Sequence, residues 1–138
     1  MAASAITGQC LCGEVRYRCD EPIENLVLCA CRDCRYITGG EPNAAALVKT
    51  DVLHITGETK GYTSTGGSGR PMTRHFCPAC GTPLFTSFSG RPGIVALKAG
   101  TLDEQQSLKV VARIWADSAP PWHDIGTDVP HFPEGFPK

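Results

Sequence analysis

Hydrophobic and polar residues alternate in short runs along the chain, and glycine or proline separates most of these runs. The run EVRYRC (14–19) places Val15 and Tyr17 on one face of an extended segment, because strand side chains alternate between two faces. Fifteen glycines and eleven prolines leave little room for long helices. Further runs of strand character cover 44–49, 52–56, 73–76, 83–88, 93–100 and 108–116. The pattern predicts a mainly β protein.

Helical turns are expected in only two places, near 32–40 and 103–107. The segment STGGSGRP (64–71) is expected to form a hairpin tip or loop. From Ala119 onward the chain is rich in proline, which favours an irregular segment laid over the sheet. Two phenylalanines in this segment, Phe132 and Phe136, are candidates for a homodimer contact.

Charge and composition exclude several classes of protein. The net charge of −1 gives no electrostatic reason to expect nucleic acid or an acidic membrane surface as a partner. No apolar run approaches the roughly 18 residues of a membrane span. The first residues lack the basic start and apolar stretch of a signal peptide, so we expect a cytoplasmic protein. In a reducing compartment eight cysteines indicate metal binding rather than disulfides.

Two of the cysteine groups predict a closed metal site. The segment CPACG holds Cys77 and Cys80 at the spacing of a zinc knuckle, and the glycine after them tolerates the positive φ of a tight turn. Such a knuckle supplies two ligands and needs a second pair. Cys10 and Cys12, in the segment CLCG, offer that pair. A Cys₄ zinc site would join the start of the chain to a later hairpin and would stabilise the fold.

The third group, CACRDC, supplies three ligands and no fourth. Cys29, Cys31 and Cys34 resemble catalytic zinc sites, in which three protein ligands leave one exchangeable position. Arg32 and Arg35 lie beside them and would favour the thiolate form and attract an anion. The alternative is a closed structural site. Its fourth ligand would then come from one of four residues, Cys19, His54, His75 or His123, although a lone cysteine such as Cys19 is more often a small core residue.

The longer motifs around these cysteines resemble a known family. They are GQCLCGEVRY, LCACRDCRYITGG, TRHFCPACGTPLF, IVALKAGTLD and RIWADSAPPWHDIGTDVPHFP. Together they are similar to the glutathione-dependent formaldehyde-activating enzymes, a family that also includes centromere protein V. The resemblance extends from about Gly8 to Pro133, so it implies one domain over 1–138 with its core in that range.

The resemblance implies a β-tent fold, in which zinc pins twisted antiparallel sheets together. It implies two zinc ions per chain, one structural and one catalytic, and a carbon–sulfur lyase activity that joins glutathione to formaldehyde. Arg32, Arg35 or Arg74 would then hold a glutathione carboxylate, and His75 is a candidate to pass a proton. The residues that the resemblance assigns to metal are Cys10, Cys12, Cys77 and Cys80 for the structural zinc and Cys29, Cys31 and Cys34 for the second.

Two positions depart from the family pattern. Ala30 stands where many relatives have a histidine, and Tyr36 stands where a second basic residue is common. The sequence therefore leaves a second function open beside the lyase, because a fold does not fix a substrate. This alternative is a non-catalytic zinc module that binds a thiol or a protein partner, with both zincs structural.

Overall fold

Ten strands and one short α-helix make up the computed structural model, which describes residues 6–123 and 129–137. The helix, α1, is Arg32–Thr38. Three 3₁₀ turns, η1 (Thr50–Val52), η2 (Ala99–Thr101) and η3 (Ala116–Ser118), connect strands. The strands are β1 (Ile6–Gln9), β2 (Arg16–Cys19), β3 (Asn25–Cys29), β4 (Asn43–Lys49), β5 (Leu53–Thr56), β6 (Lys60–Thr65), β7 (Pro71–Phe76), β8 (Pro83–Phe88), β9 (Ile94–Lys98) and β10 (Lys109–Ile114).

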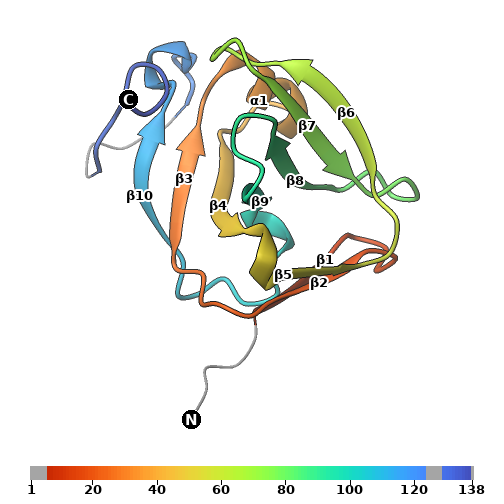
Figure 1. Ribbon diagram of the computed structural model, residues 1–138. Coiled ribbons are helices and arrows are strands. Elements are labelled where there is room, and N and C mark those ends of the chain that lie inside the picture. Colours follow the sequence, from red (N-terminus) through yellow and green to blue (C-terminus); the bar gives the residue numbers. More distant parts are fainter. Residues whose placement is uncertain (1–5, 124–128, 138) are drawn as a thin grey trace.

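The strands form two sheets that enclose the core like the sides of a tent (Figure 1). A seven-stranded sheet with the order β10-β3-β4-β9-β8-β7-β6 forms a curved wall, and a three-stranded sheet β1-β2-β5 forms the floor. Neighbouring strands are antiparallel except for β10 and β3, which are parallel. The helix α1 lies at the end of the wall away from the floor (Figure 1). This architecture agrees with the mainly β fold that the sequence predicts.

The register of the wall gives it an inner face and an outer face. Leu97 is fully buried, and it pairs with Ala46 on one side and Phe85 on the other, so these three side chains share the inner face. Because alternate residues point to opposite faces, Lys98 and Thr86 lie on the outer face. The inner face and the floor sheet enclose the hydrophobic core. Its most buried side chains are Leu84, Leu97, Val15, Cys10, Cys19 and Cys77.

The expected elements compare well with the structure, with two exceptions. The helix near 32–40 and the hairpin tip between β6 and β7 are confirmed. The prediction of a helical turn at 103–107 is wrong: these residues form a bend and an ordinary turn, and Gln105 donates its side-chain amide to the Leu102 carbonyl. The short strands β1, β3 and β6 were not expected, because their runs are short or interrupted by polar residues.

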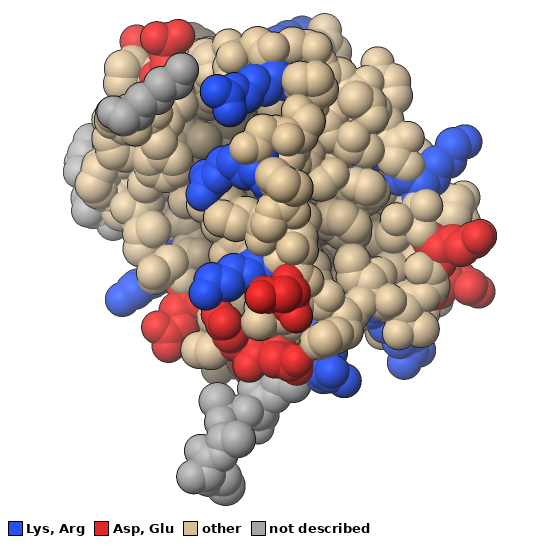
Figure 2. All heavy atoms as spheres, in the orientation of Figure 1, with Lys and Arg blue, Asp and Glu red and all other residues tan. Residues whose placement is uncertain are grey.

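Charges of both signs lie on the face of the molecule seen in Figure 2, where acidic side chains gather near the floor among basic ones. Within the described part of the chain, no helix has the length and apolar character needed to cross a membrane.

Candidate metal centres

The first cysteine cluster lies where two tight turns meet. Cys10 and Cys12 lie in the turn between β1 and β2, and Cys77 and Cys80 lie in the turn between β7 and β8. The two turns are built alike. In each, the N–H of the first cysteine donates to the carbonyl five residues later, and the glycine after the second cysteine has a φ of +82°. A glycine is needed there because other side chains are strained at positive φ.

The sulfur geometry of this cluster fits a tetrahedral metal ion. Cys12 Sγ lies 3.6 Å from Cys10 Sγ and 3.8 Å from Cys77 Sγ. Zinc–sulfur bonds of about 2.3 Å in a tetrahedron place sulfurs about 3.8 Å apart. A disulfide would need about 2.05 Å. Backbone N–H groups also point at the sulfurs, since Val15 donates to Cys10 and Cys80 donates to Cys77. The cluster can therefore hold a metal ion, and its chemistry is consistent with zinc.

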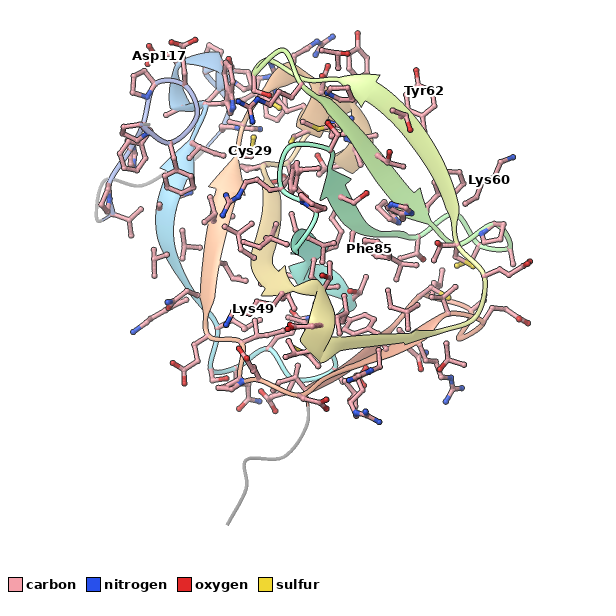
Figure 3. The ribbon with its side chains drawn as sticks, viewed as in Figure 1. Cys29, Lys49, Lys60, Tyr62, Phe85 and Asp117 are labelled. Atoms are coloured by element: carbon pink, nitrogen blue, oxygen red, sulfur yellow. The ribbon has the colours of Figure 1, made fainter. Side chains whose placement is uncertain are left out.

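The second cluster forms where β3 passes into α1. Cys29 is the last residue of β3, and Figure 3 shows it at the upper end of that strand. Cys31 caps α1, and its sulfur accepts a hydrogen bond of 3.4 Å from the Cys34 N–H. Gly39 ends the helix with a φ of +85° and donates to the Arg35 carbonyl. The end of β3 and the start of α1 together place the sulfurs of Cys29, Cys31 and Cys34 within 4.8 Å of one another.

The three thiols of this cluster perturb one another strongly. Hydrogen bonds from the Cys29 and Cys34 thiols lower the pKa of Cys31, and the same interaction raises the pKa of Cys29. Three thiols in such proximity share negative charge most readily when a cation is bound. The second cluster therefore also fits a thiophilic metal ion.

Among residues 6–123 and 129–137, no fourth Cys, His, Asp or Glu joins these three thiols. Cys19 is buried in the core and directs its Sγ to the Glu21 carbonyl. His54 contacts Asp20, and His123 contacts the Gly40 carbonyl. The interpretation of Cys19 as a core residue is thus confirmed.

His75 lies on the opposite face of the wall from Cys29. It pairs with Phe85 across β7 and β8, stacks on its ring at 4.3 Å, and contacts Ser87 Oγ at 2.9 Å. Burial lowers the pKa of His75. Since Phe85 lies on the inner face and points into the tent (Figure 3), this histidine belongs to the core side of the sheet.

The outer face brings two basic side chains to the second cluster. Lys98 donates to Asn43 Oδ1, and Asn43 is the cross-strand partner of Cys29. Burial lowers the pKa of Lys98, and the triad thiols act against this effect by their charge. Arg74 donates to Ser64 Oγ at 2.9 Å, and its charge helps to lower the pKa of Cys31. Sequence reasoning singled out Arg74 but missed Lys98 and Asn43, which no local motif marks.

A hollow of about 290 Å³ opens beside α1, lined by Arg32, Arg35, Tyr36, Gly39, Gly40 and Trp122. The Arg32 guanidinium lies 4.4 Å from the centre of the Tyr36 ring, and both side chains are exposed. Arg35 is engaged differently: it donates to the carbonyls of Ala30 and Ser118. Arg35 thus ties the cysteine turn to the segment after β10, while Arg32 presents its charge to the hollow.

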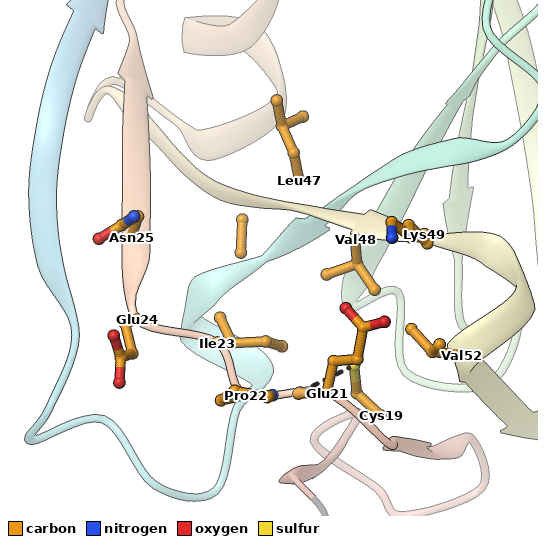
Figure 4. A pocket seen from close by; sticks show the side chains of 11 residues that line it. Cys19, Glu21, Pro22, Ile23, Glu24, Asn25, Leu47, Val48, Lys49 and Val52 are labelled. Carbon is orange, nitrogen blue, oxygen red and sulfur yellow. Dashed lines mark hydrogen bonds between the residues drawn. The ribbon is translucent and has the colours of Figure 1, made fainter.

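A second hollow, of about 210 Å³, lies away from both clusters. Figure 4 shows the side chains around it, with Cys19 and Glu21 on one side and Val48 and Lys49 on the other. None of the residues that line it belongs to either cysteine cluster. We therefore place the candidate site at the triad, not here.

The fold and the two cysteine clusters define a β protein with two candidate metal centres. The sequence matches the family model described as glutathione-dependent formaldehyde-activating enzyme over residues 5–118. The chain therefore belongs to the glutathione-dependent formaldehyde-activating enzyme family, as the motifs indicate.

A solved structure of another protein has a similar fold. A crystal structure of a Rhodobacter sphaeroides protein is similar with a TM-score of 0.55 and 21% sequence identity. The match covers 91% of this chain and 98% of that chain, so the two share their architecture over nearly their whole lengths. No curated protein matches this sequence.

Proposed function

We propose that this chain is a carbon–sulfur lyase that makes or breaks the adduct of an aldehyde with glutathione or another thiol. The observation that carries the proposal is the triad of Cys29, Cys31 and Cys34. It offers three thiol ligands, and among the described residues no fourth protein ligand completes it. An exchangeable coordination position is the mark of catalytic rather than structural zinc. Membership of the family supports glutathione and formaldehyde as the first substrates to test.

The two clusters have different tasks in this proposal. Cys10, Cys12, Cys77 and Cys80 hold a structural zinc, and the triad holds the second. Zinc at the triad supplies a position at which a substrate thiol is held as the thiolate. In the synthetic direction the sulfur adds to the aldehyde carbon, a C–S bond forms, and the proton lost by the thiol is recovered by the aldehyde oxygen. The lyase direction is the reverse.

The surrounding side chains orient the substrate. Arg32 faces the hollow beside α1, where its guanidinium suits a carboxylate of glutathione. Arg74 lies on the outer face and favours negative charge at Cys31. Arg35 has its task in holding the cysteine turn, through the Ala30 and Ser118 carbonyls. Localisation in the cytoplasm, where glutathione is abundant and thiols stay reduced, is part of the proposal.

A pair of variants tests the proposal. Zinc content and the rate of S-(hydroxymethyl)glutathione formation, followed by NMR, are compared for wild type, Cys31→Ser and Cys19→Ala. The wild type is expected to hold two zinc ions and to accelerate the reaction. Cys31→Ser should lose the acceleration, and Cys19→Ala should keep both zinc ions and the rate. Full activity in Cys31→Ser would refute the proposed mechanism, and loss of the second zinc in Cys19→Ala would indicate a closed structural site.

A further inference from the structure

Lys98 is a partly buried cation on the face of the wall that carries the triad. Its neighbours in sequence, Leu97 and Ala99, are buried in the core, and Lys98 points the opposite way. It pairs with Ala45 across β9 and β4. Asn43, two residues earlier in β4, shares that outer face. Register alone thus brings Lys98 beside the strand that leads to Cys29.

Asn43 links Lys98 to the triad. Its side-chain oxygen accepts a hydrogen bond from Lys98 Nζ, and it lies directly across from Cys29 in the pairing of β3 with β4. Directly opposed residues have their Cβ atoms about 4.5–5.5 Å apart. Burial lowers the pKa of Lys98, and the charge of the three triad thiols opposes this effect. An ammonium has three N–H donors, and within the described residues Asn43 is the one acceptor that Lys98 contacts.

The proposed reaction creates a need for such a donor. When sulfur adds to the aldehyde carbon, the electron pair of the C=O double bond moves to the oxygen. That oxygen then takes the proton that the thiol released, carried by solvent water. Hydrogen-bond donors aimed at such an oxygen stabilise the transition state. Three other basic side chains near the triad are placed differently: Arg32 and Arg35 lie at the hollow beside α1, and Arg74 is bound to Ser64.

We propose that Lys98, oriented by Asn43, donates a hydrogen bond to the aldehyde-derived oxygen of the thiol adduct. The inference rests on the proposed function of the triad. It makes Lys98 a catalytic residue and a determinant of specificity: the site favours thiols that carry an oxygen close to the sulfur. A purely structural lysine, which only balances the charge of the three thiolates, would not distinguish such thiols from alkyl thiols.

Two small thiols separate these roles without requiring turnover. 2-Mercaptoethanol and ethanethiol both offer a free thiol and carry no other charge, but only 2-mercaptoethanol has an oxygen, its hydroxyl, near the sulfur. Their affinities for zinc-loaded protein are measured by calorimetry for wild type, Lys98→Met and Lys49→Met. Lys49 is a suitable control because it is exposed and lies on the same face of β4 as Asn43, but at the hollow of Figure 4. Zinc content shows whether each variant retains the triad.

The wild type and Lys49→Met are expected to prefer 2-mercaptoethanol by about tenfold or more, the size of a charge-assisted hydrogen bond. Lys98→Met should lose this preference while it keeps zinc and its affinity for ethanethiol. With glutathione and formaldehyde, its kcat should fall about 100-fold with little change in KM. An unchanged preference in Lys98→Met would overturn the inference alone. Failure of the wild type to bind either thiol would overturn the proposed function as well.

A second variant, Asn43→Ala, tests the inference independently in case Lys98→Met does not fold. Asn43→Ala keeps the positive charge and removes the bond that orients it. The preference for 2-mercaptoethanol should then fall by about threefold to tenfold, within the range of one hydrogen bond. A preference equal to that of the wild type would contradict the part given to Asn43 and, through it, the orientation of Lys98.

Discussion

Cys12 Sγ lies 3.8 Å from Cys77 Sγ although 65 residues separate them in the chain. The contact joins the floor sheet to the β7–β8 hairpin of the wall. Among the described residues, no strand of the floor pairs with a strand of the wall. The cysteine cluster therefore adds a link between two sheets whose other contacts are side-chain packing and a few hydrogen bonds, such as that from Leu11 N–H to Thr82 Oγ1.

Metal removal should weaken this link. In Cys77→Ser the first cluster loses a buried ligand, and the free energy of metal binding that contributes to folding is lost with it. We expect one metal ion fewer per chain and a free energy of unfolding lower by at least about 3 kcal/mol. Thermal unfolding and metal analysis test this. Equal melting temperatures for Cys77→Ser and wild type would contradict the structural role.

Close packing between β1 and β2 leads to a second prediction. A Cβ at Gly8 would overlap the Tyr17 ring and the Thr101 carbonyl oxygen. The Tyr17 hydroxyl is fixed at 2.7 Å from Thr101 Oγ1, so the ring has no room to move. Gly8→Ala should lower the free energy of unfolding by about 1–3 kcal/mol.

The control for this prediction is Gly100→Ala. A Cβ added at Gly100 would meet no heavy atom within 4 Å, and Gly100 has no positive φ. Chemical denaturation of both variants provides the comparison. Equal free energies of unfolding for Gly8→Ala and Gly100→Ala would show that β1 can shift to make room for a methyl group at Gly8. That result would contradict the close packing of Gly8 against Tyr17 and Thr101.

The two arginines beside the triad should respond differently to substitution. Arg35 donates two hydrogen bonds to backbone carbonyls, at Ala30 and Ser118, whereas the one described residue to which Arg32 donates is Tyr36, through its hydroxyl. Arg35→Ala should therefore lower the free energy of unfolding by about 2–3 kcal/mol. Arg32→Ala should leave stability within about 0.5 kcal/mol and raise the KM for glutathione. The opposite pattern would exchange the roles of the two side chains.

The cysteine clusters illustrate what local sequence predicts well. The segments CPACG and CLCG fold into matched turns because cysteine spacing and a following glycine determine the turn geometry within a few residues. CACRDC likewise forms its cluster locally, between the last residue of β3 and the first turn of α1. The pairing of the first two segments is harder to predict, since it depends on a contact between different sheets.

Residues brought together by strand register lie beyond local sequence reasoning. Lys98 and Asn43 are 55 residues apart, and their contact exists only because β9 pairs with β4 in one register. A shift by one residue would turn Lys98 into the core. The alternation of side chains along β7 likewise places His75 on the inner face of the wall and Arg74 on the outer face. No pattern within the segment TRHF distinguishes these two outcomes.

The measurement that most directly tests the account is a calorimetric titration of zinc-loaded protein with glutathione, with S-methylglutathione as the control. The two ligands differ only in the free thiol. We expect heat of binding from glutathione and much weaker binding from the methylated form, because the position completed by the ligand at Cys29, Cys31 and Cys34 requires a thiolate. Equal binding of the two, or no binding of either, would contradict capture of the glutathione thiol at this site.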